Sequence, residues 1–219
     1  KAIRRQRQMC IRDRMRTTKF LNTNIQVITQ HELLKELKKG VVITPNVDHL
    51  VKLQKDKEFY EVYKQAEWVI CDSKILYILS KLLKTPLPEA IPGSSFFTAF
   101  YEYHKNDTNC KIFLLGAAEG IAIKAMERIN QKVGRKIVVG AHSPSYGFEK
   151  KTKECEELID IINESGANVL LVGVGAPKQE KWIMKYRNRM PNIDIFMGLG
   201  ATIDFEAGTL KRAPIFWQK

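Results

Sequence analysis

The chain has 219 residues, of which 44% are hydrophobic, and it carries a formal net charge of +12. This length suits one or two compact domains with a sizeable core. No apolar run approaches the ~18 residues that a membrane-spanning helix needs, so the sequence is typical of a globular protein rather than of an integral membrane protein.

Half of the net charge lies at the N-terminus, where residues 1–16 hold seven basic side chains against the single acid Asp13. Residues 1–14 show no apolar period, so we expect them to be disordered. A basic arm for nucleic acid or membrane would look similar. We favour a non-native stretch, because RQRQMCIRDR resembles translated sequencing-adapter sequence. The native chain is then expected to start at Met15, with one domain over 15–219 and no nucleic acid partner.

From residue 25 onward, short β-like runs alternate with helical patterns. The predicted strands cover residues 41–44, 68–71, 111–116, 136–141, 168–173 and 193–198. The helical patterns between and after them cover residues 47–54, 73–83, 91–104, 119–133, 153–165, 177–190 and 199–208. This alternation predicts parallel strands in a layered α/β fold. The Ser/Pro/Gly-containing loop at 142–150 could separate two lobes.

Parallel α/β sheets bind ligands outside the carboxyl ends of their strands, so the residues that follow each strand form the candidate site. Polar and glycine residues gather at these positions: Thr44, Asn46, Asp72, Gly116, Gly173, Gly175, Lys178, Gln179, Glu180, Gly200 and Asp204.

The turn at 173–178 reads GVGAPK, which is not the G-x-G-x-x-G of a dinucleotide fold because Lys178 holds the third glycine position. Pro177 suits a first helical position, so a helix should begin there. Free N–H groups at that helix end, together with Lys178, would bind an anion, and Gly173 and Gly175 would let it approach the backbone. The alternative is a tight turn with a solvated polar face.

A second glycine turn at 198–202 leads to Asp204, and Lys211 and Arg212 follow as candidate phosphate clamps. Two such turns on successive strands favour a phosphate-bearing ligand.

Asp72 closes the apolar run WVICD. A carboxylate at a buried strand end has a raised pKa and suits a general base. Asp72 could instead be the N-cap of the next helix, and Asn46 could be a cap as well. No histidine stands at metal-ligand spacing from a partner, and no D-x-D motif occurs, so we predict no metal site.

Several motifs together identify a resemblance. In chain order they are ITPNVDHL, VICDS, IPGSSFF, IFLLGAAEGIA, SPSYGF, LLVGVGAPKQEKW and GLGATIDFEAGTLKRAP. This series resembles the WecG/TagA/CpsF glycosyltransferase family over roughly residues 20–215.

The resemblance implies a Rossmann-like sheet with helices on both faces. It also implies metal-independent, inverting transfer from a UDP-sugar donor, without a further cofactor. The best-known activity adds N-acetylmannosamine to undecaprenyl-diphosphate-linked N-acetylglucosamine in wall teichoic acid synthesis. The lipid-diphosphate acceptor implies peripheral contact with the inner face of the bacterial cell membrane and a cytoplasmic location, and it leaves open whether the protein is a homo-oligomer.

Carried over residue by residue, the resemblance makes Asp72 the catalytic base, with Thr44 and Asn46 as polar active-site neighbours. It places residues 175–180, with Asp204, in the donor-binding region. The same region includes three glycines at or after strand ends and one candidate phosphate clamp: Gly116, Gly173, Gly200 and Arg212.

The sequence departs from the family pattern in two respects. Ala90 occupies a position two residues before the PG turn where relatives often have arginine, and Lys74 could replace that charge. Relatives also continue past RAP with thirty or more residues, so we expect this chain to be truncated at its C-terminus.

Three alternatives stay open at this point. The same fold could use another UDP-sugar, such as a uronic acid or a hexose, for capsule or exopolysaccharide. The chain could be a non-catalytic nucleotide-sugar-binding protein, or a nucleotide-binding oxidoreductase, which lacks a proper fingerprint.

Overall fold

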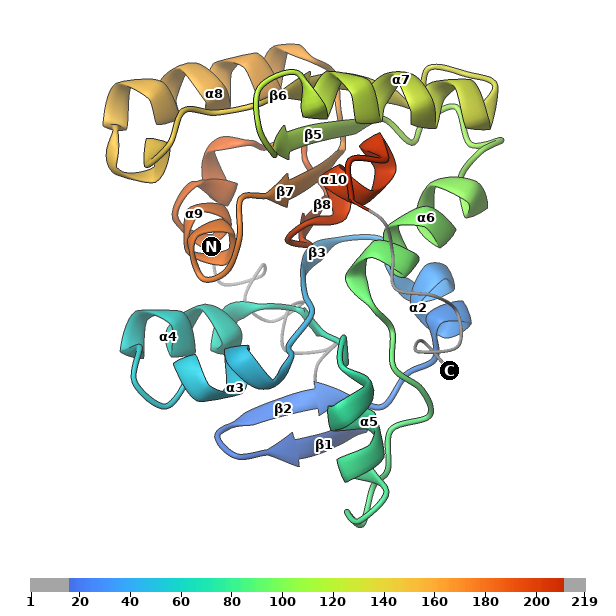
Figure 1. The fold of residues 1–219 in the computed structure, drawn as a ribbon, viewed down its shortest axis with the longest axis vertical. Coiled ribbons are helices and arrows are strands. Elements are labelled where there is room, and N and C mark those ends of the chain that lie inside the picture. The colour runs from blue at the N-terminus through green and yellow to red at the C-terminus, as the bar shows by residue number, and fades with distance from the viewer. Residues whose placement is uncertain (1–15, 211–219) are drawn as a thin grey trace.

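The computed structural model describes residues 16–210, and within them six strands form one parallel sheet. Their order across the sheet is β4-β3-β8-β7-β5-β6 (Figure 1). The strands are β3 (Gly40–Ile43), β4 (Trp68–Val69), β5 (Ile112–Gly116), β6 (Val138–His142), β7 (Val169–Gly173) and β8 (Ile195–Gly198). The predicted α/β fold with a parallel sheet is confirmed.

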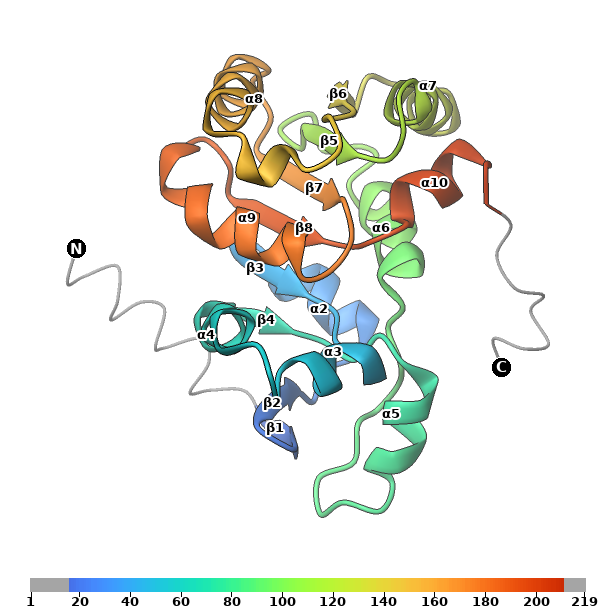
Figure 2. The same cartoon turned by 60° about the vertical axis from the view of Figure 1, so that its left-hand side comes forward.

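Helices cover both faces of this sheet, and Figure 2 separates the two layers. One layer holds α3 (Val47–Lys52), α4 (Lys57–Gln65), α8 (Thr152–Glu164) and α9 (Lys178–Tyr186). The other holds α2 (Gln30–Glu36), α6 (Gly93–Tyr103), α7 (Ile121–Val133) and α10 (Thr202–Ala207). The chain is therefore a three-layer α/β/α structure, as expected for a Rossmann-like fold.

The two layers enclose two hydrophobic cores, and each strand contributes to both. In β7, Leu170 and Val172 face the core under α8 and α9, while Val169 and Leu171 face the opposite core. Because both faces of the strand are buried, its sequence is a continuous apolar run rather than an alternating one. This is why the parallel strands were readable from the sequence.

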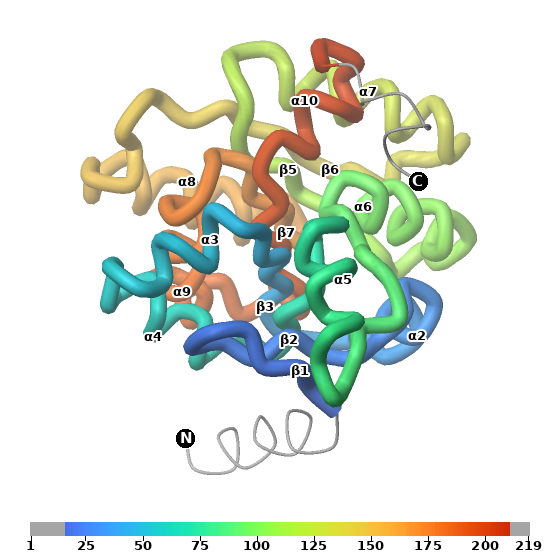
Figure 3. The backbone as a smooth tube through the Cα atoms, turned by 60° about the horizontal axis from the view of Figure 1, so that its bottom comes forward, coloured from blue at the N-terminus to red at the C-terminus, as the bar shows by residue number. Residues whose placement is uncertain are grey.

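A two-stranded antiparallel hairpin, β1 (Thr17–Phe20) and β2 (Thr23–Gln26), was not anticipated. Figures 1 and 3 place it beside α5 (Lys74–Ser80), at the end of the molecule opposite α7 and α8. Helices α2 and α4 were not predicted either.

The loop at 142–150 does not divide the sheet. It joins β6 to α8 and contains the short 3₁₀ helix η1 (Phe148–Lys150), while a second one, η2 (Arg187–Arg189), follows α9. Strands on either side of the loop in sequence, β6 and β7, both pair with β5.

Candidate active site

Strand topology brings the predicted residues to one edge of the sheet. Thr44 and Asn46 follow β3, Asp72 follows β4, and the glycine turns follow β5, β7 and β8. Because β8 stands between β3 and β7, the edge has two halves that meet at Leu199 and Gly200. The β3/β4 half carries the carboxylate, and the β5/β7/β8 half carries the glycine turns.

Asp72 is half-buried and is held by backbone on two sides. Its Oδ1 accepts a hydrogen bond from the Gly93 N–H at 2.7 Å, and its own N–H donates to the Pro45 carbonyl at 3.2 Å. Burial raises the pKa of Asp72, and the bond from Gly93 opposes that rise. A carboxylate with a raised pKa is a better proton acceptor, which suits a general base.

The alternative role of Asp72 as a helix cap is wrong. Ser73 is the N-cap of α5, and its side chain accepts from the Leu76 N–H at 3.5 Å. Asn46, in contrast, does cap a helix, because its Oδ1 accepts from the His49 N–H at 3.0 Å. The NH₂ group of Asn46 can still donate to a ligand.

Thr44 is buried at the end of β3 and lies beside Gly93, the first residue of α6. A methyl group added to Gly93 would come within 3.4 Å of the Thr44 Oγ1 and 3.0 Å of a Leu199 methyl group. Gly93 thus lets the start of α6 approach β3 and β8 closely while its N–H orients Asp72. Thr44 and Asp72 therefore share one neighbour, and the structure brings these two predicted residues together.

Glycines allow the ends of β5, β7 and β8 to approach one another. A Cβ at Gly116 would lie 2.4 Å from the Gly173 carbonyl oxygen, and one at Gly173 would lie 2.6 Å from the Gly200 carbonyl oxygen. Both contacts are with backbone, which cannot move aside easily. Gly116 and Gly173 are thus required for backbone packing at the strand ends.

Gln179 joins the two glycine turns. Its Oε1 accepts from the N–H groups of Gly175 and Gly200, both at 3.1 Å, and its Nε2 donates to the Glu180 Oε1 at 2.7 Å. Gln179 and Glu180 are 2% and 0% exposed, so the alternative of a solvated polar face is wrong. These two buried side chains hold the two glycine turns in place from the protein interior.

Glu180 is a buried acid below the sheet edge. Burial raises its pKa from 4.5 to about 7, against the hydrogen bond from Gln179 and the charge of Lys52. Its Oε2 makes no hydrogen bond within the part of the chain that the structure describes. Such a group costs folding free energy when it is ionised.

An open pocket of about 360 Å³ lies over the β5/β7/β8 half of the edge, within the size range of small-molecule sites. Its lining consists of Ala117, residues 144–149, Gly173, Val174, Gly175, Lys178, Gly200, Ala201 and Asp204. Five predicted donor residues line it: Gly173, Gly175, Lys178, Gly200 and Asp204. The predicted residues Gly116, Gln179 and Glu180 lie outside the lining, and Arg212 lies outside the described residues, as does the 1–14 stretch.

The helix after the first glycine turn starts one residue later than predicted. Pro177 is the N-cap and Lys178 is the first residue of α9, and no side chain caps this end. The Gln179 N–H donates to the Gly175 carbonyl at 3.1 Å, so the partial positive charge of the helix N-terminus and the full charge of Lys178 are what favour an anion here.

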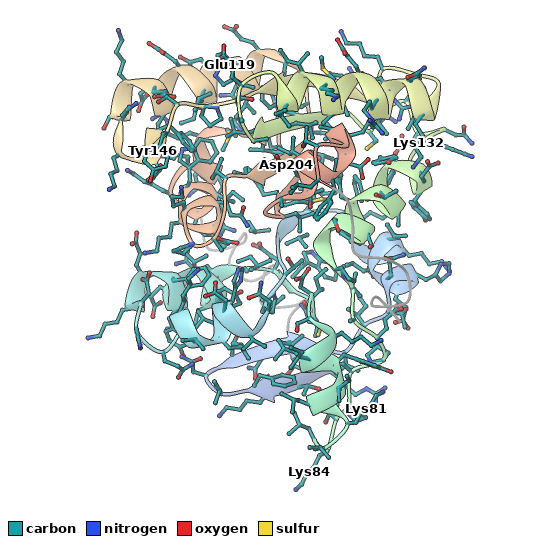
Figure 4. The ribbon with its side chains drawn as sticks, in the orientation of Figure 1. Lys81, Lys84, Glu119, Lys132, Tyr146 and Asp204 are labelled. Carbon is teal, nitrogen blue, oxygen red and sulfur yellow. The ribbon has the colours of Figure 1, made fainter. Side chains whose placement is uncertain are left out.

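Tyr146 is the most exposed of the lining residues that sequence reasoning did not single out. It is 96% exposed at the pocket, and the Lys178 Nζ lies 5.5 Å from its ring centroid. Figure 4 shows Tyr146 on the α8 side of the site and Asp204 on the α10 side. An aromatic residue inside a Ser/Pro/Gly loop was the available signal.

Two further findings concern metals and membranes. Among residues 16–210, no group of three or more His, Cys, Asp or Glu side chains could hold a metal ion. No helix in the same range is both long and apolar enough to cross a bilayer.

Comparison with known proteins gives a consistent family match. The model of the glycosyl transferase WecG/TagA/CpsF family matches residues 18–219. A protein from Bacillus spizizenii strain W23 is 29% identical over 202 residues, which cover 90% of this chain and 75% of the relative. One from Staphylococcus aureus strain NCTC 8325 is 28% identical over 179 residues, 81% of this chain and 67% of the relative. Both relatives are named N-acetylglucosaminyldiphosphoundecaprenol N-acetyl-beta-D-mannosaminyltransferase.

Proposed function

The chain belongs to the WecG/TagA/CpsF glycosyltransferase family, and on that premise we propose that it transfers N-acetylmannosamine from a UDP-sugar to undecaprenyl-diphosphate-linked N-acetylglucosamine. The reaction inverts the anomeric centre and serves cell-surface polysaccharide synthesis at the inner face of the bacterial cell membrane. The observation that carries the proposal is the division of one sheet edge into a carboxylate half and an anion-binding half.

The chemistry of the pocket supports a nucleoside diphosphate as the ligand. The uncapped start of α9 and Lys178 offer positive charge to the diphosphate. Asp204 offers a hydrogen-bond acceptor to a hydroxyl or ring N–H, and Tyr146 offers a flat face to a base. Gly175 has open space around its missing side chain, so a ligand can approach the backbone there.

The carboxylate half supports a base-assisted displacement. The Gly93 N–H occupies Asp72 Oδ1, which leaves Oδ2 to accept the proton of the acceptor hydroxyl. The hydroxyl oxygen then bonds to the anomeric carbon as the bond from that carbon to the diphosphate breaks. Lys178 and the α9 N-terminus stabilise the departing UDP, and Asn46 and Thr44 orient the sugar hydroxyls.

The central test is turnover with UDP-N-acetylmannosamine and a lipid-diphosphate-linked N-acetylglucosamine. We expect UDP release that requires the acceptor and persists in EDTA, since the side chains and helix end already supply positive charge to the leaving group. Loss of turnover in EDTA, restored by Mg²⁺ or Mn²⁺, would contradict metal independence.

A panel of UDP-sugars in the same assay distinguishes the remaining alternatives. Preference for a uronic acid or a hexose would replace N-acetylmannosamine as the proposed donor sugar. Tight binding of a UDP-sugar without any UDP release would make the protein a nucleotide-sugar binder.

Tyr146 provides a test of the donor pocket. Stacking of a base on an aromatic ring contributes about 1–3 kcal/mol, so Tyr146→Ala should raise the Kd for UDP roughly 5- to 150-fold in calorimetry. The melting temperature should not change, because the side chain is almost fully exposed. Tyr103→Ala is the matched control, since Tyr103 is 47% exposed and outside the pocket. Unchanged UDP affinity in Tyr146→Ala would show that the nucleobase of UDP does not stack on Tyr146.

A further inference from the structure

Helix α5 and the turn after it expose an apolar surface that the sequence pattern does not predict. Residues 73–83 carry six large apolar side chains at helical spacing, a pattern typical of a buried face. Only Leu76 among them is buried. The other five are 38–84% exposed and form what we call the apolar patch: Ile75, Ile78, Leu79, Leu82 and Leu83.

The segment that carries the patch is well anchored, so the exposure is not fraying of a loose end. Leu76 and Leu87 are buried in the core. The Ser80 Oγ accepts from the Leu87 N–H at 3.0 Å and donates to the Tyr77 carbonyl at 2.6 Å. The Thr18 hydroxyl of β1 donates to the carbonyl of Thr85. The fold therefore holds the apolar patch outward.

The charges near the patch favour one kind of partner over another. Lys74, Lys81 and Lys84 belong to the same segment, and no acidic residue occurs between 73 and 88. Figure 4 places Lys81 and Lys84 at the outer end of this segment. A second copy of the chain docked on this surface would bring lysines against lysines. An anionic lipid surface would take the apolar side chains into its acyl boundary and pair the lysines with its headgroups. Lys81 would do so with the N–H groups that remain beside its 3.2 Å bond to the Leu87 carbonyl.

The helix that carries the patch also follows the candidate catalytic residue directly along the chain. Helix α5 begins two residues after Asp72, and its cap Ser73 adjoins that carboxylate. With seven residues, α5 can lie in the plane of a membrane surface but cannot cross it.

We propose that the apolar patch, with Lys74, Lys81 and Lys84, is the surface by which this protein docks on an anionic lipid bilayer. Docked in this way, Asp72 faces a lipid-linked acceptor whose polyprenyl chain stays in the membrane. This orientation rests on the proposed function, whereas the docking itself does not.

The test is co-sedimentation of the full chain with vesicles of phosphatidylcholine and phosphatidylglycerol, without substrates. Leu79→Gln/Leu82→Gln should lower the partition coefficient at least about tenfold. Each substitution removes the favourable free energy of moving a leucine side chain from water into the bilayer. Lys81→Gln/Lys84→Gln should lower it roughly tenfold or more and weaken its salt dependence. The matched control is Ile123→Gln/Ile161→Gln, because these side chains are 49% and 41% exposed on α7 and α8, at the opposite end of the molecule.

Several results would overturn docking by this patch. They are no vesicle binding by the unaltered chain, equal binding by the leucine variant, or an effect of the control as large as that of the leucine variant. Loss of self-association in place of vesicle binding would assign the patch to a second copy. A large fall in melting temperature in the leucine variant would show that other parts of the chain cover it.

A water-soluble short-chain acceptor separates this inference from the proposed function. The leucine variant should keep turnover on that acceptor and lose turnover on acceptor embedded in vesicles. If no acceptor supports turnover but vesicle binding behaves as described, the proposed function fails and the docking surface stands.

Discussion

Asp72→Asn is expected to lower kcat by a factor of about 10²–10⁴, the usual contribution of a general base. The asparagine Oδ1 can still accept the hydrogen bond from the Gly93 N–H, so the site keeps its geometry. UDP affinity should stay unchanged, because Asp72 is not among the residues that line the pocket. Turnover and UDP titrations of the purified variant measure both quantities.

The stability of the Asp72 variant should move in the opposite direction from its activity. Because burial raises the pKa of Asp72 in the folded state, the protonated form fits the fold better than the ionised form. The ionised carboxylate therefore costs stability at neutral pH, and a neutral asparagine removes that cost. We expect an equal or higher melting temperature in Asp72→Asn.

Ser73→Ala is the matched control for this experiment. It removes the cap of α5, whose 3.5 Å bond is long, so stability should fall by an amount near the lower end of about 0.5–2 kcal/mol. Its kcat should stay close to that of the unaltered chain. Near-normal turnover in Asp72→Asn would rule out this carboxylate as the base.

The pH dependence of kcat/KM gives a second measurement of the same assignment. The rate should fall as pH is lowered through the raised pKa of Asp72, since the protonated carboxyl cannot accept a proton. In Asp72→Asn this acidic limb should disappear from any residual activity.

The sequence predicted those strands and helices whose local residue pattern matches their burial in the fold. The strand before Gly173 and the helix after Pro177 were readable because a doubly buried strand is continuously apolar and proline marks a helix start. The β1–β2 hairpin was not readable, because Leu21 adopts a positive φ of 50° in its turn. Glycine is the usual residue at a first turn position with this conformation, and Asn22 after it is a weaker signal alone.

The site was predictable as a set of residues but not as a set of roles. Residues after strands meet at one edge in any parallel sheet, which is why Asp72 and the glycine turns could be expected at that edge. The burial of Gln179 between two turns depends on β7 and β8 being neighbours, and local sequence does not encode strand order. The apolar period of residues 73–83 predicted the helix but not the exposure of its apolar side chains, since periodicity cannot say whether another layer covers them.

Glu180 and His49 should give the protein opposite pH dependences of stability that nearly cancel. Burial raises the pKa of Glu180 from 4.5 to about 7 and lowers the pKa of His49 from 6.5 to about 4. Between pH 4.5 and 7 the folded state holds a proton on Glu180 that the unfolded state has lost, so stability falls as pH rises. Between pH 4 and 6.5 the unfolded state holds a proton on His49 that the folded state lacks, so stability rises with pH.

Each effect amounts to about 3 kcal/mol across its window. Both groups lie near Lys52. Tyr63 lies near both, because its hydroxyl is 2.7 Å from the His49 Nδ1, and its pKa is raised first by burial and then by the charge of Glu180. A tyrosine whose pKa is raised stays neutral across this range. The two slopes should therefore leave the stability of the unaltered chain almost level in the overlapping window.

Single substitutions should reveal separately how Glu180 and His49 make the stability depend on pH. Glu180→Gln keeps an acceptor for Gln179 and should give stability that rises with pH over the His49 window, ending about 3 kcal/mol above the unaltered chain beyond pH 7. His49→Gln should give the reverse slope, and the double variant should be level again. Chemical denaturation at several pH values measures these differences, and lost packing would shift each curve without changing its slope. Parallel curves for all four proteins would show that neither group changes its proton affinity on folding. The buried Glu180 carboxyl would then have to be solvated or otherwise paired.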